Sequence, residues 1–127
     1  MYKNRIKTTI DKLRVLIEEI KEENALIVVE GKNDKKSLEE LGFTNIKPIA
    51  GKPQHIFLNE LLNENSLIVI LTDLDKEGRK QYGRICEYAE RNGLRVDMRL
   101  RKVIAKLPVK QIESLANFLS KYENEYC

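Results

Sequence analysis

Two short apolar runs in this chain end at carboxylates, and these carboxylates are its most chemically informative residues. Residues 25–29 end at Glu30, and residues 67–71 are followed by Asp73 and Asp75. Apolar runs of this length bounded by polar residues predict buried strands. The carboxyl ends of parallel strands meet at one edge of a sheet, so the three carboxylates should converge there. Like charges at short range oppose ionisation, and a hard cation such as Mg²⁺ relieves that conflict. The pattern therefore predicts a metal site facing a phosphate.

Neighbouring residues could assist such a site, although each also has a simpler interpretation. Lys32 could contact a phosphate or a leaving oxygen, or it could be a solvated lysine. Asp34 could be a fourth acid, although a helix N-cap is the better interpretation. Gly31 and Gly78 would allow the backbone to approach metal or substrate closely. A lone aspartate at a strand end is usually a turn former, but three acids at two matched strand ends favour a functional site.

A basic region follows the second acidic motif. Residues 91–110 carry seven Lys and Arg residues against one acid, Asp97. Residues 94–101 alternate between apolar and charged, which predicts a strand with Arg95, Arg99 and Arg101 on one exposed face. Arg79, Lys80 and Arg84 add charge just beyond the acidic motif. We expect this surface to contact RNA or DNA phosphates, and the alternative is a solvated, edge-protecting strand face.

The elements that must position these residues form an alternating pattern. A helical stripe in residues 3–23 precedes strands at 25–29, 45–49, 67–71 and 94–101. Helices are expected from residue 33 or 34 to 41, from 53 to 62, from 77 to 92, and from Pro108 onward. This order predicts an α/β fold, a mostly parallel sheet of about four strands with helices on both faces. We expect an N-terminal amphipathic helix at 1–24 and a single domain at 25–127.

The N-terminal stripe has two interpretations. Ile6, Ile10, Leu13, Ile17 and Ile20 recur at helical spacing. The helix could pack on its own domain, or it could dock a second copy or a partner protein. Three heptads are too few to require a coiled coil.

Composition limits the remaining classes. The chain has 127 residues, of which 42% are hydrophobic and 34% are charged, as expected for one packed domain with a charged surface. Its two cysteines form no CxxC pair, which argues against a disulfide framework and a zinc site. No apolar run approaches a membrane span, and the N-terminus lacks a signal-type apolar region, so we expect a cytoplasmic protein.

Two motifs resemble the Toprim domain, which is found in bacterial-type primases, in type IA and type II topoisomerases and in certain nucleases. They are Val-Val-Glu-Gly-Lys-Asn-Asp at 28–34 and Thr-Asp-Leu-Asp-Lys-Glu-Gly-Arg at 72–79. Glu30 matches the family glutamate, and Asp73, Asp75 and Gly78 match its DxDxxG motif. The chain looks most similar to small stand-alone Toprim proteins and to the Toprim domain of the nuclease that matures ribosomal RNA. The similarity spans about residues 25–115.

The resemblance implies a compact Rossmann-like Toprim fold and one or two Mg²⁺ ions, with Mn²⁺ able to substitute. It implies that Glu30 and Asp73 share one ion, that Asp73 and Asp75 hold a second, and that Glu30 also serves as general acid or base. The leading function is nuclease-like phosphodiester hydrolysis. The alternatives are a non-catalytic module that binds nucleic acid or ribonucleoprotein, and a primase-type nucleotidyl-transfer subunit that needs a partner. The accessory domains of primases, type IA topoisomerases and the maturation nuclease have no counterpart in these 127 residues.

Overall fold

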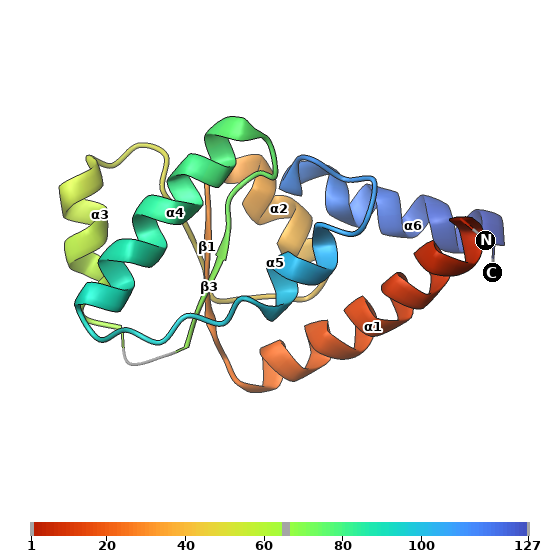
Figure 1. The fold of residues 1–127 in the computed structure, drawn as a ribbon, viewed down its shortest axis with the longest axis horizontal. Coiled ribbons are helices and arrows are strands. Elements are labelled where there is room, and N and C mark those ends of the chain that lie inside the picture. Colours follow the sequence, from red (N-terminus) through yellow and green to blue (C-terminus); the bar gives the residue numbers. More distant parts are fainter. Residues whose placement is uncertain (1, 65–66, 127) are drawn as a thin grey trace.

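The computed structural model describes residues 2–64 and 67–126, and a parallel sheet lies at the centre of the fold (Figure 1). Its strands are β1 (Leu26–Val29), β2 (Ile46–Pro48) and β3 (Ile68–Leu71), in the order β2-β1-β3. Strands β1 and β3 pair in parallel, with Val29 opposite Leu71. Every residue of β1 and β3 is buried, which explains why both strands are continuous apolar runs.

Helices cover both faces of the sheet, which confirms the expected α/β class. Helices α3 (Gln54–Leu61) and α4 (Lys76–Arg91) cover one face. The other face carries α1 (Tyr2–Glu22), α2 (Lys32–Glu40), α5 (Arg99–Ile104) and α6 (Leu115–Tyr126), the last preceded by the short helix η1 (Ile112–Ser114). Each face of the sheet has its own hydrophobic core, and successive strand residues point to opposite cores. Val28 and Ile70 face α3 and α4, whereas Ile27 and Val69 face the larger core on the other side.

Helix α1 packs on its own domain. Its predicted apolar stripe, Ile6, Ile10, Leu13, Ile17 and Ile20, is buried in the larger hydrophobic core. Helix α1 is also linked to α6, because Arg14 Nε of α1 donates to Glu123 Oε1 of α6 over 2.8 Å. Both helices extend toward the same side of the molecule (Figure 1). The stripe is therefore not the exposed docking surface that the second interpretation required.

The predicted fourth strand at 94–101 is wrong. Only one bridge forms there, between Ile68 and Val96, so the described sheet has three strands rather than about four. Asp97 Oδ1 accepts a hydrogen bond from Arg99 N over 2.9 Å, and α5 begins at Arg99. Leu100 and Ile104, four residues apart on α5, are both buried. The turn at Asp97 stops the extended segment after the bridge at Val96. The apolar residues that follow, Leu100 and Ile104, are spaced as in a helix rather than a strand.

Other predicted boundaries need smaller corrections. Pro108 does not open the last helix, because residues 107–111 form a connection that crosses beside Asp73, where Leu74 N donates to Lys110 O over 2.7 Å. The N-cap of α2 is Gly31 rather than Asn33 or Asp34. Within the described residues, no helix combines the length and the apolar character that crossing a membrane would need.

Candidate functional site

The carboxyl ends of β1 and β3 bring Glu30 and Asp73 into contact, as the matched strand ends predicted. Glu30 Oε2 accepts a hydrogen bond from Asp73 N over 2.7 Å. Asp73 Oδ1 accepts one from Ile112 N, at the start of η1, over 2.9 Å. Both side chains are partly buried. The two carboxylates are thus positioned by two backbone N–H groups, one from the loop after β3 and one from the start of η1.

These carboxylates open onto a cleft of about 670 Å³. Its charged lining consists of Glu30, Asp34, Asp73, Glu113 and Lys32. Asp34 lies in the first turn of α2, where its Oδ2 accepts from Gly31 N over 2.9 Å. Lys32 is exposed at the first residue of the same helix. Four carboxylates against one ammonium make the charged lining of this cleft predominantly negative. Sequence reasoning did not single out Glu113, and no motif marked it.

The cleft raises the pKa of two of its carboxyl groups. Burial is the largest cause of the raised pKa of Glu30, and the nearby charges of Asp73 and Asp34 add to it. The hydrogen bond from Asp73 N opposes that rise. Burial likewise raises the pKa of Asp34, against the effect of the Gly31 N–H. Both groups therefore hold a proton more readily than ordinary carboxylates, and a bound cation would remove that tendency.

Asp75 has a different position from Asp73. It is exposed and caps α4, where its Oδ1 accepts a hydrogen bond from Gly78 N over 2.8 Å. It is not among the residues that line the cleft. The chain bends at residues 74–75 instead of remaining extended, so the two aspartates do not point the same way.

Gly78 is required by the loop itself. A Cβ at this position would lie 2.0 Å from the carbonyl oxygen of Asp73, far inside any real contact. Residues 72–75, which connect β3 to α4 and carry Asp73 and Asp75, form the acidic loop. Thr72 Oγ1 donates to Gly78 O over 2.6 Å, so the first turn of α4 is hydrogen-bonded to this loop. The close approach expected at Gly78 is therefore to the chain's own backbone. A Cβ at Gly31 would meet only Asp34 Oδ2, at an ordinary 4.0 Å.

Arg101 is buried beneath the acidic loop, not on an exposed strand face. Its Nη2 donates to Asp73 O over 3.0 Å, and its Nη1 donates to the backbone and hydroxyl oxygens of Thr72. The guanidinium carbon lies 4.4 Å from the centre of the Tyr82 ring, a cation–π contact. Burial is the main cause that raises the pKa of Tyr82 to about 12. Arg101 thus stabilises the acidic loop by donating to the carbonyl oxygens of Thr72 and Asp73. The alternating sequence pattern did not predict this role.

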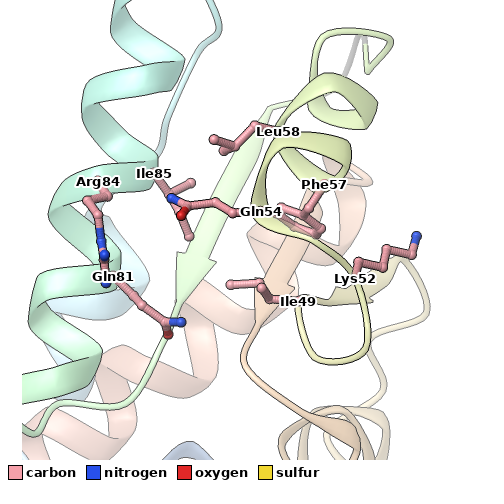
Figure 2. A pocket seen from close by; sticks show the side chains of 8 residues that line it. All are labelled: Ile49, Lys52, Gln54, Phe57, Leu58, Gln81, Arg84 and Ile85. Atoms are coloured by element: carbon pink, nitrogen blue, oxygen red, sulfur yellow. The ribbon is translucent and has the colours of Figure 1, made fainter.

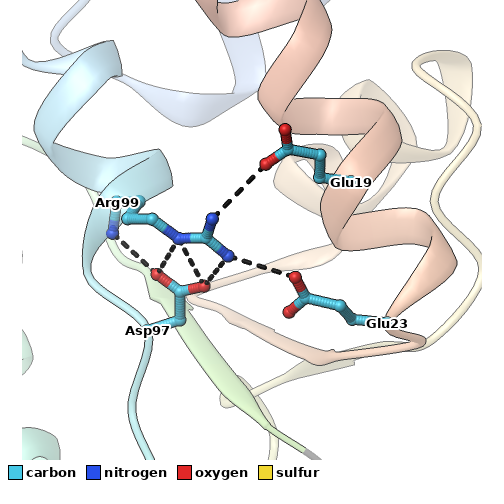
Figure 3. Close-up of polar contacts among 4 residues, drawn as sticks. All are labelled: Glu19, Glu23, Asp97 and Arg99. Atoms are coloured by element: carbon cyan, nitrogen blue, oxygen red, sulfur yellow. Dashed lines mark hydrogen bonds and ion pairs between the residues drawn. The ribbon is translucent and has the colours of Figure 1, made fainter.

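Arg99 is held by carboxylates of its own chain (Figure 3). Its guanidinium contacts Asp97, Glu19 and Glu23, with its shortest contact, Nη2 to Asp97 Oδ2, at 2.6 Å. The expected shared face of Arg95, Arg99 and Arg101 does not form. Arg79, Lys80 and Arg95 are exposed, and Lys80 makes a long ion pair with Glu77 at 3.7 Å.

The donor set at Glu30 and Asp73 fits a hard divalent cation. In the described part of the chain, no three His, Cys, Asp or Glu side chains gather closely enough to form a complete metal cluster. Mg²⁺ does not need one, because it typically uses one or two carboxylates and completes its shell with water and phosphate oxygens. The oxygen donors, the like charges and the open cleft all suit such an ion.

Comparison with known proteins gives consistent matches. The Toprim domain family matches residues 25–100. A UPF0292 protein of Methanocaldococcus jannaschii is 34% identical over 118 residues, covering 87% of this chain and 92% of the relative. A UPF0292 protein of Pyrococcus horikoshii is 33% identical over 110 residues, covering 82% and 81%. A solved structure, described as a putative protein from Aquifex aeolicus, superposes with a TM-score of 0.70 at 31% identity, covering 77% of this chain and 93% of that one.

Proposed function

The chain belongs to the Toprim family and is related to the UPF0292 proteins, and we propose that it is a Mg²⁺-dependent enzyme that hydrolyses phosphodiester bonds in nucleic acid. Membership of the Toprim family associates the chain with metal binding and with nucleic acid. Hydrolysis, the identity of the ion and the roles of individual residues are the proposal.

The observation that carries this proposal is the contact between Glu30 and Asp73 at the edge of the sheet. Two carboxylates from neighbouring parallel strands lie against each other in an open cleft, and the pKa of Glu30 is raised. The buried Arg101 beside them donates to carbonyl oxygens of the loop. The hydrogen bonds of Arg101 thus go to the backbone of the loop, and the oxygens of Glu30 and Asp73 remain available to a bound cation.

The proposed roles follow from these positions. Glu30 and Asp73 hold the ion, and Mn²⁺ can take its place. When bound, the ion polarises the phosphate and stabilises charge on the attacking and leaving oxygens. Alternatively, Asp73 holds the ion without Glu30, and the Glu30 carboxyl, whose pKa is raised when no cation is bound to it, passes its proton to the leaving oxygen. Asp75 keeps its hydrogen bond to Gly78 through Oδ1 and offers its other oxygen to a second ion.

Basic side chains around the cleft would hold the substrate. Lys32 lines the cleft and contacts the phosphate. Arg79, Lys80 and Arg95 are exposed and contact the nucleic-acid backbone, independent of sequence. Arg99 and Arg101 no longer belong to that set, because carboxylates and carbonyl oxygens of the chain itself occupy their guanidinium groups.

A non-catalytic binding module is the second candidate. Asp75 is engaged as a helix cap, and within the described residues no complete three-carboxylate cluster is present. An ion held by Glu30 and Asp73 alone could organise phosphate contacts without hydrolysis. A primase-type subunit that docks a partner through α1 gains no support, because the apolar stripe of α1 is buried.

A cleavage assay separates these candidates. The protein would be incubated with labelled structured RNA and with single-stranded DNA, with Mg²⁺ or Mn²⁺. We expect Asp73→Asn and Glu30→Gln to lower metal-dependent cleavage by about 100-fold or more. Asp11→Asn is the matched control, because Asp11 is exposed on α1 and pairs only with Lys7 among the described residues.

The possible results are distinct. Cleavage that persists unchanged in Asp73→Asn would come from a contaminant and would reject the proposal. Salt-sensitive binding without cleavage would favour the binding module.

A further inference from the structure

A second concavity lies between α3 and α4, on the sheet face opposite α1 (Figure 2). Its volume is about 210 Å³, room for a single small ring system rather than a large ligand. Ile49, Phe57, Leu58 and Ile85 supply its apolar walls. Two glutamine side chains, Gln54 from α3 and Gln81 from α4, reach between the helices.

Gln81, which lines this pocket, carries one polar atom that has no partner in the described structure. Gln81 Oε1 is buried, and none of the described residues donates a hydrogen bond to it. A buried acceptor without a donor costs about 1–3 kcal/mol, so such an atom requires an explanation. If the Gln81 amide turned toward the pocket, an N–H group of a ligand would satisfy this oxygen, and each glutamine amide can both donate and accept.

The charge of the pocket favours an anionic ligand. Arg84 of α4 lines it and is exposed, and no carboxylate is among the lining residues. Lys52 also lines it, but its amine points away (Figure 2) and donates to Glu60 Oε2 over 2.7 Å. Arg84 is therefore the residue that would meet a negative group, and a guanidinium suits a phosphate well.

The pocket and the acidic cleft share one loop. Pro48, Ala50 and Gly51 line the cleft, whereas Ile49, between them in the chain, lines the pocket. The loop is tied to the sheet by Ala50 N, which donates to Glu30 O over 2.9 Å. A ligand in the pocket is therefore one loop away from the carboxylates that face the phosphate.

We propose that the α3–α4 pocket binds the base of one unstacked nucleotide, with Gln54 and Gln81 contacting the base edge and Arg84 its phosphate. The apolar walls accept the faces of the ring, and the amides satisfy its polar edge. A base paired in a duplex cannot enter, so the ligand is a nucleotide of a single strand or a free nucleotide. This inference rests on the proposed function and names its substrate class.

Binding in the absence of metal tests the pocket separately from cleavage. Isothermal titration with EDTA present would use two probes, the four nucleoside 5′-monophosphates and short single-stranded hexanucleotides. We expect Gln81→Leu and Arg84→Met each to weaken binding about tenfold, the effect of losing a hydrogen bond to a charged or buried group. Arg91→Met is the matched control, because it removes the same charge from an exposed site on α4, and its affinity should stay within about twofold of wild type.

Each outcome decides the proposal. Binding of hexanucleotides but not monophosphates, weakened in both variants, identifies a polymer; binding of monophosphates, weakened likewise, identifies a free nucleotide. Affinity unchanged in Arg84→Met and Gln81→Leu, or no binding of either probe, overturns the pocket. Arg84 is exposed, so its variant stays informative even if Gln81→Leu fails to fold.

The test also separates the two proposals. Binding that depends on the pocket, in a protein without metal-dependent cleavage, rejects hydrolysis and leaves the pocket standing. Cleavage that depends on Glu30, with binding insensitive to both pocket variants, supports hydrolysis and rejects nucleotide binding in the pocket.

Discussion

Two regions of this molecule gather several carboxylates around an arginine, and they use the arginine in opposite ways. At the α1–α5 contact, Arg99 donates directly to Asp97 and pairs with Glu19 and Glu23 (Figure 3). The hydrogen bond from Arg99 is the main cause that lowers the pKa of Asp97. At the cleft, Arg101 donates to carbonyl oxygens, and the pKa of Glu30 is raised.

The difference indicates which cluster is structural. Around Arg99 the negative charges have a partner within the chain, so that cluster fastens α1 to α5. Around Glu30 the arginine fixes the shape of the loop, and the carboxylates keep their mutual repulsion. A site that retains unfavourable charge is a candidate for a bound cation.

Gly78→Ala should have the largest effect on stability. The new Cβ would overlap the Asp73 carbonyl oxygen, so either the loop or α4 must move. We expect a loss of about 3 kcal/mol in the free energy of unfolding, measured by urea denaturation. Gly83→Ala is the control on the same helix, because no atom lies within 4 Å of its built Cβ, and it should stabilise by up to about 1 kcal/mol. Equal effects at the two glycines would show that the loop is not tightly fixed.

Arg101→Met should cost about 2–3 kcal/mol, because it removes buried charged hydrogen bonds to Thr72 and Asp73. It should also weaken Mg²⁺ binding in titration calorimetry, since Asp73 loses its support. Arg101→Lys should restore part of both quantities. Lys102→Met, at the exposed neighbouring position, should change neither. Unaltered Mg²⁺ affinity in Arg101→Met would remove the positioning role.

Asp97→Asn should destabilise the protein by less than Arg101→Met, and only where Asp97 is ionised. Its folded pKa is lowered from 3.8, so its contribution is present above that pH and is lost as the pH falls through the folded value. Denaturation of wild type and variant should differ at pH 7 and converge at lower pH. A difference that persists in strong acid would mean that charge is not the cause.

Of these variants, Glu30→Gln should change the free energy of unfolding least, and it should stabilise the protein rather than destabilise it. The raised pKa of Glu30 means that its protonated form favours the folded state, and this contribution is lost as the pH rises from 4.5 through the folded value. At pH 7 in EDTA, the neutral side chain should therefore stabilise by about 0.5 kcal/mol, an effect reduced by its partial exposure. Added Mg²⁺ should stabilise wild type more than the variant. A destabilised variant in EDTA would contradict charge repulsion at the cleft.

The sequence alone determined the class of fold and the location of the acidic edge. Continuous apolar runs define β1 and β3 because both faces of these strands are buried, and Glu30 and Asp73 follow directly from the strand ends. The Toprim resemblance at residues 28–34 and 72–79 was confirmed by the family match over residues 25–100. These features are local, and local pattern is what a single sequence records.

Only the tertiary structure decided what the arginines do and where the two aspartates point. Arg95, Arg99 and Arg101 share a period of two or four, which fits a strand, but the turn at Asp97 converts the segment to helix. Burial of Arg101 depends on carbonyl oxygens of residues 72 and 73, some thirty positions away in the chain. Asp75 lies outside the cleft lining, and its carboxylate instead accepts a hydrogen bond from Gly78 N. Contacts between distant segments compete with local periodicity, and their outcome becomes visible only when the chain is folded.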